Sequence, residues 1–147
     1  MNDQNLKKTT DELLNVLNGL NRTEDLEDYL GDIDDGKYSM SFPEYYNSLP
    51  EVNALDKTEL MRRSGIERTY FYQLLNGTRN PGRDKVIALC IAAGLDLKHT
   101  QRALKLSNLG ILYSKNRRDA IIIFSINRHL SNVDTEELLD RLGEKIL

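Results

Sequence analysis

Apolar residues recur at helical spacing in a series of short segments, and this pattern limits the possible folds more than any other feature. Only three prolines and nine glycines interrupt the 147 residues. One run, 120–124, is rich in β-branched residues and is compatible with a buried strand. No partner strand is visible elsewhere, and the polar residues around the run fit a helix over 116–130. The sequence therefore predicts an all-α chain.

Linkers and helix signals predict three parts. An N-terminal arm covers residues 1–36, and the stretch of Asp, Gly and Ser between Gly31 and Ser41 is typical of a linker. A main domain of short helices covers residues 37–110, and a helical extension covers residues 111–147. The length suits one small domain with such appendages.

Each helix is predicted from its capping residues and its apolar stripe. In the main domain, Glu59 stands three residues after a cap, as in a capping box. The expected helices are 13–20 after Thr10, 24–30 ended by Gly31, 43–49 interrupted by Pro50, 57–63 capped by Asp56, 67–75 closed by Asn76 and Gly77, 83–93 ended by Gly94, 97–106 capped by Asp96, 116–130, and 135–145 capped by Asp134.

The charge is distributed unevenly along the chain. The net charge of −3 says little about a partner. Residues 1–50, however, carry four basic and eleven acidic side chains, whereas residues 51–120 carry thirteen basic and seven acidic ones. Residues 121–147 are acidic again, with three basic and five acidic side chains. The basic middle indicates a polyanionic partner, and an ordinary solvated surface with uneven charge is the alternative.

Composition excludes several classes of protein. Hydrophobic residues make up 39% and charged residues 29%, which is typical of an ordered globular chain. The longest apolar run, 86–93, has eight residues, so we expect no bilayer span, and no signal peptide is recognisable. The single cysteine, Cys90, excludes an internal disulfide and suits a cytoplasmic protein. It stands in an apolar run and is expected to be an inert core thiol.

Two short helices with a glycine between them form the most informative pattern. Residues 57–63 and 67–75 are joined by a tight turn containing Gly65, which suits the positive φ of such a turn. This is the layout of a helix-turn-helix, whose second helix can lie in the major groove of DNA. Phe71 and Leu74 are expected to face the core. The opposite face then carries four side chains able to read base edges: Arg68, Thr69, Tyr72 and Gln73.

Residues suited to the DNA backbone surround that face. The start of the first helix offers backbone N–H groups, and the segment after the second helix supplies further donors. The predicted phosphate contacts are Lys57, Asn76, Thr78, Arg79, Arg83 and Lys85. For the base-reading face, the alternative is an ordinary solvated helix surface.

The segment 55–94 resembles the helix-turn-helix of the lambda-repressor/Cro superfamily, also called the XRE family. The strongest part of the resemblance is Asn76-Gly77 followed by Arg79, Pro81 and an apolar helix. It extends over about residues 42–107. It implies a five-helix DNA-binding domain that acts as a homodimeric transcriptional regulator on double-stranded DNA. It also implies roles for seven residues: Lys57 as a clamp on the first helix, Arg68, Thr69, Tyr72 and Gln73 as base readers, and Asn76 with Arg79 as backbone contacts.

The chain departs from the family pattern at four positions. Met61 stands where the family prefers alanine, and Ser64 where it prefers an apolar residue. Glu67 replaces the usual Ser or Thr cap of the reading helix. Its carboxylate suits the helix dipole but would repel a nearby phosphate. Pro50 falls inside what the family has as a continuous first helix.

The sequence gives little support for catalysis. His99 and His129 lie thirty residues apart with no neighbours at metal-ligand spacing, and no phosphate loop or nucleophile elbow is present. We therefore expect no enzyme, no metal and no cofactor.

Two functions remain: a DNA-binding regulator, or a protein-interaction adaptor that binds a protein through its acidic arm or its C-terminal helices. The arm's apolar stripe must pack on the domain, on a second copy or on another protein. The arm's negative charge adds the hypothesis that it covers the DNA-reading face and inhibits it. In the C-terminal extension, the apolar residues are expected to complete the core or to form a dimer interface.

Overall fold

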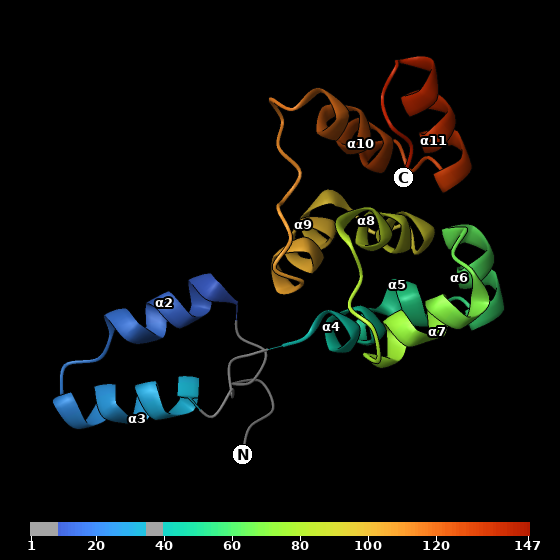
Figure 1. Cartoon of the computed structure of the whole chain (residues 1–147). Helices are drawn as coiled ribbons and strands as arrows, with labels where there is room; N and C mark the ends of the chain where they lie inside the picture. Colours follow the sequence, from blue (N-terminus) through green and yellow to red (C-terminus); the bar gives the residue numbers. More distant parts are fainter. Residues whose placement is uncertain (1–8, 35–39) are drawn as a thin grey trace. The chain divides into compact units, whose positions relative to one another are not determined.

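The computed structural model describes residues 9–34 and 40–147, and within these ranges the chain consists of helices and loops without a strand (Figure 1). The prediction of an all-α chain is confirmed for this part. The chain divides into two compact units, Met1–Met40 and Ser41–Leu147. The predicted boundary at residue 36 lies outside the described residues, and the predicted boundary at residue 110 stays a prediction. No helix in the described ranges is long and apolar enough to cross a membrane.

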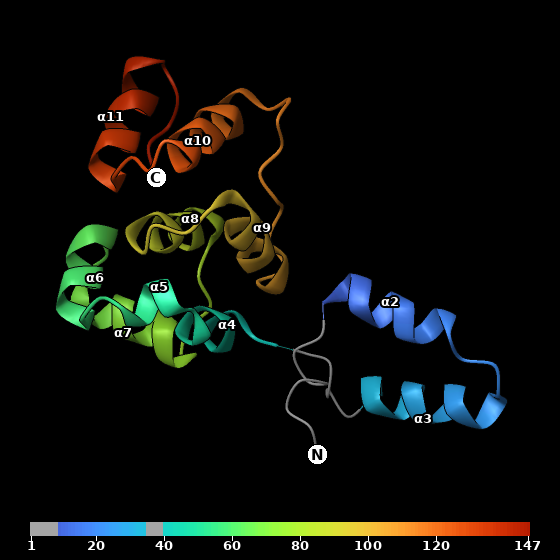
Figure 2. The same ribbon diagram turned by 180° about the vertical axis from the view of Figure 1, so that it is seen from behind.

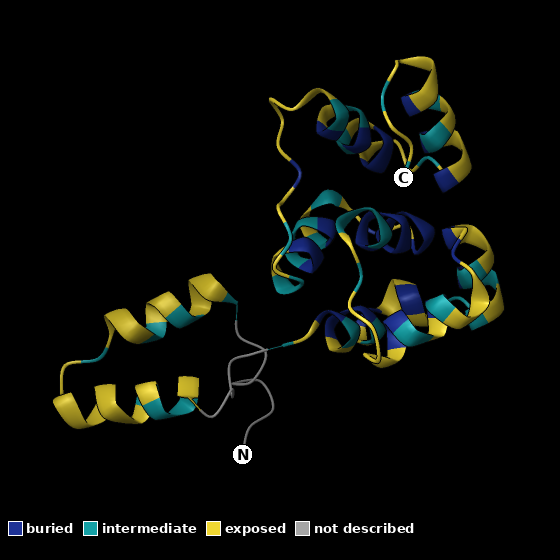
Figure 3. Cartoon of the chain, in the orientation of Figure 1, coloured by how far each residue is buried: buried dark blue, intermediate teal, exposed yellow. Residues whose placement is uncertain are grey.

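In the part of the first unit that the structure describes, residues 9–34, the chain forms α2 (Thr10–Asn18) and α3 (Thr23–Asp34). Thr9 and Glu12 form a reciprocal capping box at the start of α2, so the cap is Thr9 rather than Thr10. The prediction that Gly31 ends α3 is wrong. Gly31 lacks the left-handed conformation of a helix-ending glycine, and the apolar stripe continues through it to Ile33. Neither helix has a buried residue (Figure 3).

The second unit is built around one buried helix, α8, in which every residue from Val86 to Ala92 is buried. It packs against α6, α9 and α11, and Figure 2 shows this arrangement from behind. The helices of the second unit are α4 (Phe42–Ser48), α5 (Pro50–Asn53), α6 (Lys57–Ser64), α7 (Arg68–Asn76), α8 (Arg83–Ala92), α9 (Leu97–Leu106), α10 (Arg117–Asn127) and α11 (Asn132–Arg141).

Most of the predicted helix limits in this unit are confirmed within one or two residues. Asp56 and Asp96 accept backbone N–H bonds as N-caps, and Pro50 separates α4 from a one-turn helix. The run 120–124 lies inside α10, so its strand alternative is excluded. Asp134 is not the cap of the last helix. Ser131 fills that place because its hydroxyl accepts the Asp134 N–H, and α11 therefore begins three residues earlier than predicted.

The C-terminal helices complete the core of the second unit. Ile122 of α10 and Leu139 of α11 are fully buried. The side-chain amide of Asn132 donates to two backbone carbonyls, Arg63 O at the end of α6 and Ala88 O in α8, each at 2.9 Å. This amide fixes the start of α11 to both helices.

Candidate nucleic-acid interface

The turn between α6 and α7 depends on two small residues. Gly65 ends α6 with φ of 68°, a left-handed conformation that a side chain would strain. The buried hydroxyl of Ser64 donates to Met61 O and accepts the N–H of Ile66 at 3.2 Å. The backbone of the turn thus supplies hydrogen-bond partners for the Ser64 hydroxyl. These partners explain how a polar residue fits at a buried position where the resemblance led us to expect an apolar one.

The two faces of α7 differ sharply. Phe71 and Leu74 are fully buried beside Leu75, whereas the predicted base-reading residues lie along the other side. Arg68, Thr69 and Tyr72 are exposed, and Gln73 is half-buried. The structure thus brings the four predicted side chains together on one helix.

Two arginines near this face rest on tyrosine rings. The guanidinium carbon of Arg68 lies 6.0 Å from the ring centre of Tyr72, one helical turn away. Arg79 lies 4.8 Å from the ring centre of Tyr70. Cation–π contacts of this kind restrict where a long side chain points. Neither contact was predicted from the sequence, although the i, i+4 spacing of Arg68 and Tyr72 could have indicated the first.

Glu67 caps α7 and closes its N-terminus. Its carboxylate accepts the N–H groups of Thr69 at 2.9 Å and Tyr70 at 3.0 Å. These two bonds lower the pKa of Glu67, so the helix begins with a firmly ionised side chain. Two of the backbone donors that a phosphate would need at this helix end are therefore occupied.

The loop after α7 is ordered by its own polar groups. Asn76 accepts the N–H of Thr78 at 2.8 Å, and the N–H of Arg79 donates to Gln73 O at 3.2 Å. Gly77 provides the left-handed residue between them, with φ of 83°. The side chains of Asn76, Thr78 and Arg79 stay exposed beside the end of α7.

The basic residues of α6 are partly neutralised. Glu59 accepts from Arg62 at 2.6 and 3.0 Å and from Arg63 at 2.9 Å, and these bonds lower the pKa of Glu59 to about 2. The predicted capping-box role of Glu59 is therefore wrong, because its carboxylate turns to the arginines. Lys57, at the start of α6, is half-buried.

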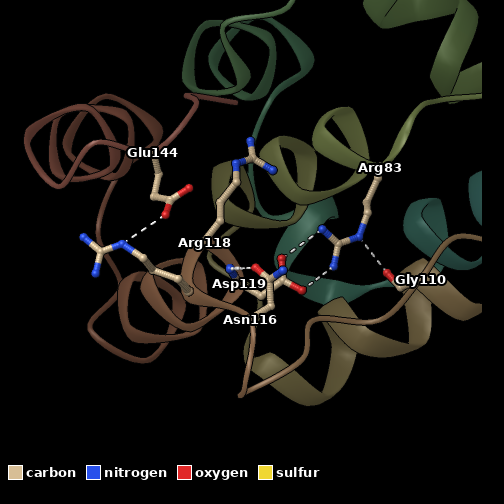
Figure 4. Close-up of a pocket in the computed structure, with 7 residues that line it drawn as sticks. Arg83, Gly110, Asn116, Arg118, Asp119 and Glu144 are labelled. Carbon is tan, nitrogen blue, oxygen red and sulfur yellow. Dashed lines mark hydrogen bonds and ion pairs between the residues drawn. The ribbon is translucent and has the colours of Figure 1, made fainter.

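Arg83, a predicted phosphate contact, is held inside the fold (Figure 4). Its guanidinium donates to Gly110 O, to Ile111 O and to both carboxylate oxygens of Asp119, at 2.8 to 3.0 Å. Four of its five N–H donors are thus engaged. Burial alone would raise the pKa of Asp119, but the bonds from Arg83 and from the Tyr113 N–H lower it overall.

The surroundings of Arg83 form a pocket of about 570 Å³ between α8, α10 and the C-terminal segment. Each arginine that lines it is paired with a carboxylate: Arg83 with Asp119, Arg117 with Glu144, and Arg118 with Asp84. The pocket therefore offers no excess charge to an anionic ligand. Lys85, another predicted phosphate contact, lies in the first turn of α8, two residues after Arg83, and is half-buried.

Cys90 is fully buried in α8, and burial raises the pKa of its thiol to about 12. This agrees with the predicted inert core thiol.

Comparison of the chain with protein-family models, with curated proteins and with solved structures finds no match. The resemblance of residues 55–94 to the lambda-repressor/Cro superfamily therefore stays a prediction from the sequence.

Proposed function

We propose that this chain is a sequence-specific DNA-binding transcriptional regulator of the lambda-repressor/Cro type, in which α7 reads the major groove. The observation that carries the proposal is the division of α7. Its apolar face is buried, while Arg68, Thr69 and Tyr72 are exposed on the other side, and the loop that follows α7 carries Arg79. A helix of this kind fits the major groove and presents hydrogen-bonding groups to base edges.

Three of the four side chains have a suitable target among the bases. Arg68 pairs with guanine, Gln73 with adenine, and Thr69 with either base or with a thymine methyl group. The stacking of Arg68 on Tyr72 supports this role because a restrained guanidinium loses less side-chain entropy on binding. The proposed five-helix core consists of α4, α6, α7, α8 and α9.

The proposed phosphate contacts are those of the predicted residues that are not engaged inside the fold: Lys57, Asn76, Thr78, Arg79 and Lys85. Arg83 is left out because its guanidinium is bound to Asp119 and to two backbone carbonyls. The protein binds as a homodimer whose two half-sites lie about one helical turn, roughly 34 Å, apart.

The double substitution Arg68→Ala/Gln73→Ala tests the reading role of α7. Double-stranded DNA sites are first selected from a random pool with the full chain, and binding is then followed by fluorescence anisotropy. We expect the double variant to lose about 100-fold in affinity for the selected site, since each good base contact contributes about 1–3 kcal/mol. Its affinity for unselected DNA should fall much less.

With about three or four phosphates per half-site, wild-type affinity should fall by about 10³-fold or more between roughly 50 and 200 mM salt.

Arg141→Ala is the matched control for the loss of one positive charge, because Arg141 is exposed on α11. It should leave site preference unchanged. Selection of no preferred site by the wild type, or an equal loss in the Arg141 variant, would overturn the proposal.

Glu67→Ser should tighten DNA binding. Serine keeps an N-cap for α7, whereas the substitution removes a carboxylate that stands near the DNA phosphates in the proposed complex. One charge pair a few ångströms apart in a solvated interface is worth about 1 kcal/mol, so affinity should rise about fivefold at low salt. Anisotropy titrations at two salt concentrations measure this, and thermal unfolding verifies that stability is unchanged. Weaker or unchanged binding would place Glu67 away from the phosphates.

A further inference from the structure

We propose that the helix pair α2–α3 is a docking surface for a basic amphipathic helix of another protein. The two helices belong to the first unit and α7 to the second, and the proposal does not depend on DNA binding.

The two helices expose apolar side chains that are normally buried in a folded domain. Exposed fractions are 53% for Leu14, 38% for Leu17, 39% for Leu26, 47% for Leu30 and 49% for Ile33. Neither helix has a single buried residue (Figure 3). Two helices of 9 and 12 residues are too short to form a core of their own. Contiguous exposed apolar residues on such elements indicate an interaction site.

The spacing of these residues fits a helical occupant. Leu26, Tyr29, Leu30 and Ile33 stand at i, i+3, i+4 and i+7, which places them in one stripe along α3. A stripe of this kind receives the apolar face of another helix, as in helix-in-groove recognition. Leu14 and Leu17 of α2 stand at i and i+3 and add a second, shorter exposed stripe.

Acidic residues border the apolar stripe on both edges. At 100° per residue, Glu27 and Asp34 lie on one edge of α3, and Asp25 and Asp32 lie on the other. Residues 9–34 carry eight acidic side chains and one basic side chain, Arg22, so their net charge is −7. Arg22 itself lies 3.5 Å from Glu24.

This charge determines the class of occupant. A second copy of the pair would bring another seven negative charges to the same apolar seam, and like charges at short range are unfavourable. A partner helix with lysine and arginine beside its own apolar stripe would instead pair these basic residues with the acidic edges of α3 while its leucines pack on the exposed apolar residues. The occupant is therefore a helix with leucine-like residues at i, i+3, i+4 and i+7 and basic residues on its flanks.

The test uses the full chain and two labelled synthetic peptides of about 18 residues, or five helical turns. In the first peptide, leucines at helical spacing are flanked by lysines, and in the second, glutamates replace the lysines. We expect the lysine peptide to bind at least about tenfold more tightly by fluorescence anisotropy. Amide chemical-shift changes should be confined to residues 9–34. Leu26→Ser/Leu30→Ser should weaken this binding about tenfold or more, since apolar contacts are lost.

Val133→Ser is the matched control, because Val133 is 73% exposed on α11, in the other unit. It should leave peptide binding unchanged. Since Leu26 and Leu30 are exposed, their replacement should leave the second unit folded, which its amide spectrum verifies. Equal binding of both peptides, shift changes outside residues 9–34, or self-association of the chain that Leu26→Ser/Leu30→Ser abolishes would each overturn the proposal. A failed DNA titration would leave these outcomes unaffected.

Discussion

Asp119→Asn is expected to lower the free energy of unfolding by about 3 kcal/mol, because it leaves Arg83 without its charged partner in a largely buried position. The Asp119 side chain is 7% exposed and that of Arg83 is 28% exposed. The carboxylate also accepts the backbone N–H of Tyr113 at 3.0 Å. One side chain therefore connects α8, the loop before α10 and α10 itself. Urea unfolding at neutral pH, followed by circular dichroism, measures the loss.

The same loss should depend on pH. The folded state lowers the pKa of Asp119 below its ordinary value of 3.8, so the unfolded chain takes up the proton first as the pH falls. The ionised carboxylate therefore contributes its full stabilisation above that value and loses it on further acidification. The difference between wild type and Asp119→Asn should be largest near neutral pH and should shrink below about pH 4.

Glu144→Gln provides a control in the same pocket. Glu144 pairs with Arg117 at 3.0 Å, but the Arg117 side chain is 67% exposed, and such surface pairs contribute less than about 1 kcal/mol. Replacing both members of the buried pair, as Arg83→Met/Asp119→Leu, should recover part of the stability lost in the single variant. If Asp119→Asn costs no more than Glu144→Gln, the pair does not hold these elements together.

Local signals were sufficient to predict most of the helices. A cap such as Asp56 or a closing glycine such as Gly77 acts on backbone groups within three or four residues, so its effect is visible in a short stretch of sequence. Gly31 shows the limit of this reasoning. A glycine can continue a helix when the apolar stripe runs past it, as the stripe does here from Leu30 before Gly31 to Ile33 after it.

The buried and exposed faces of α7 could be predicted from periodicity, but the ion pairs of the arginines could not. Arg83 meets Asp119 across 36 positions, and Arg118 meets Asp84 across 34. Partners this far apart in the chain cannot be paired from local spacing. The basic middle segment therefore offers less free positive charge than its composition indicates. Beside α7, Arg68 and Arg79 rest on aromatic rings instead.

Leu139→Ala is expected to destabilise the whole second unit by about 3 kcal/mol, because it removes a fully buried side chain and leaves a cavity. Leu139 lies on α11, which packs against α8 and α10. Urea unfolding gives the magnitude, and Leu142→Ala is the matched control. Leu142 is 42% exposed just after the same helix, so its replacement should cost less than about 1 kcal/mol.

Amide hydrogen exchange of the Leu139→Ala variant shows which elements depend on α11. Asn132 links the start of α11 to Arg63 O, in the last turn of α6 and two residues before the turn at Gly65. We therefore expect the slowest amides of α6 and α8 to lose as much protection as those of α11, since all three unfold together. Loss confined to α10 and α11 would instead make residues 111–147 a separate cooperative unit. In that case, the orientation of α6 against α7 would not depend on the C-terminal helices.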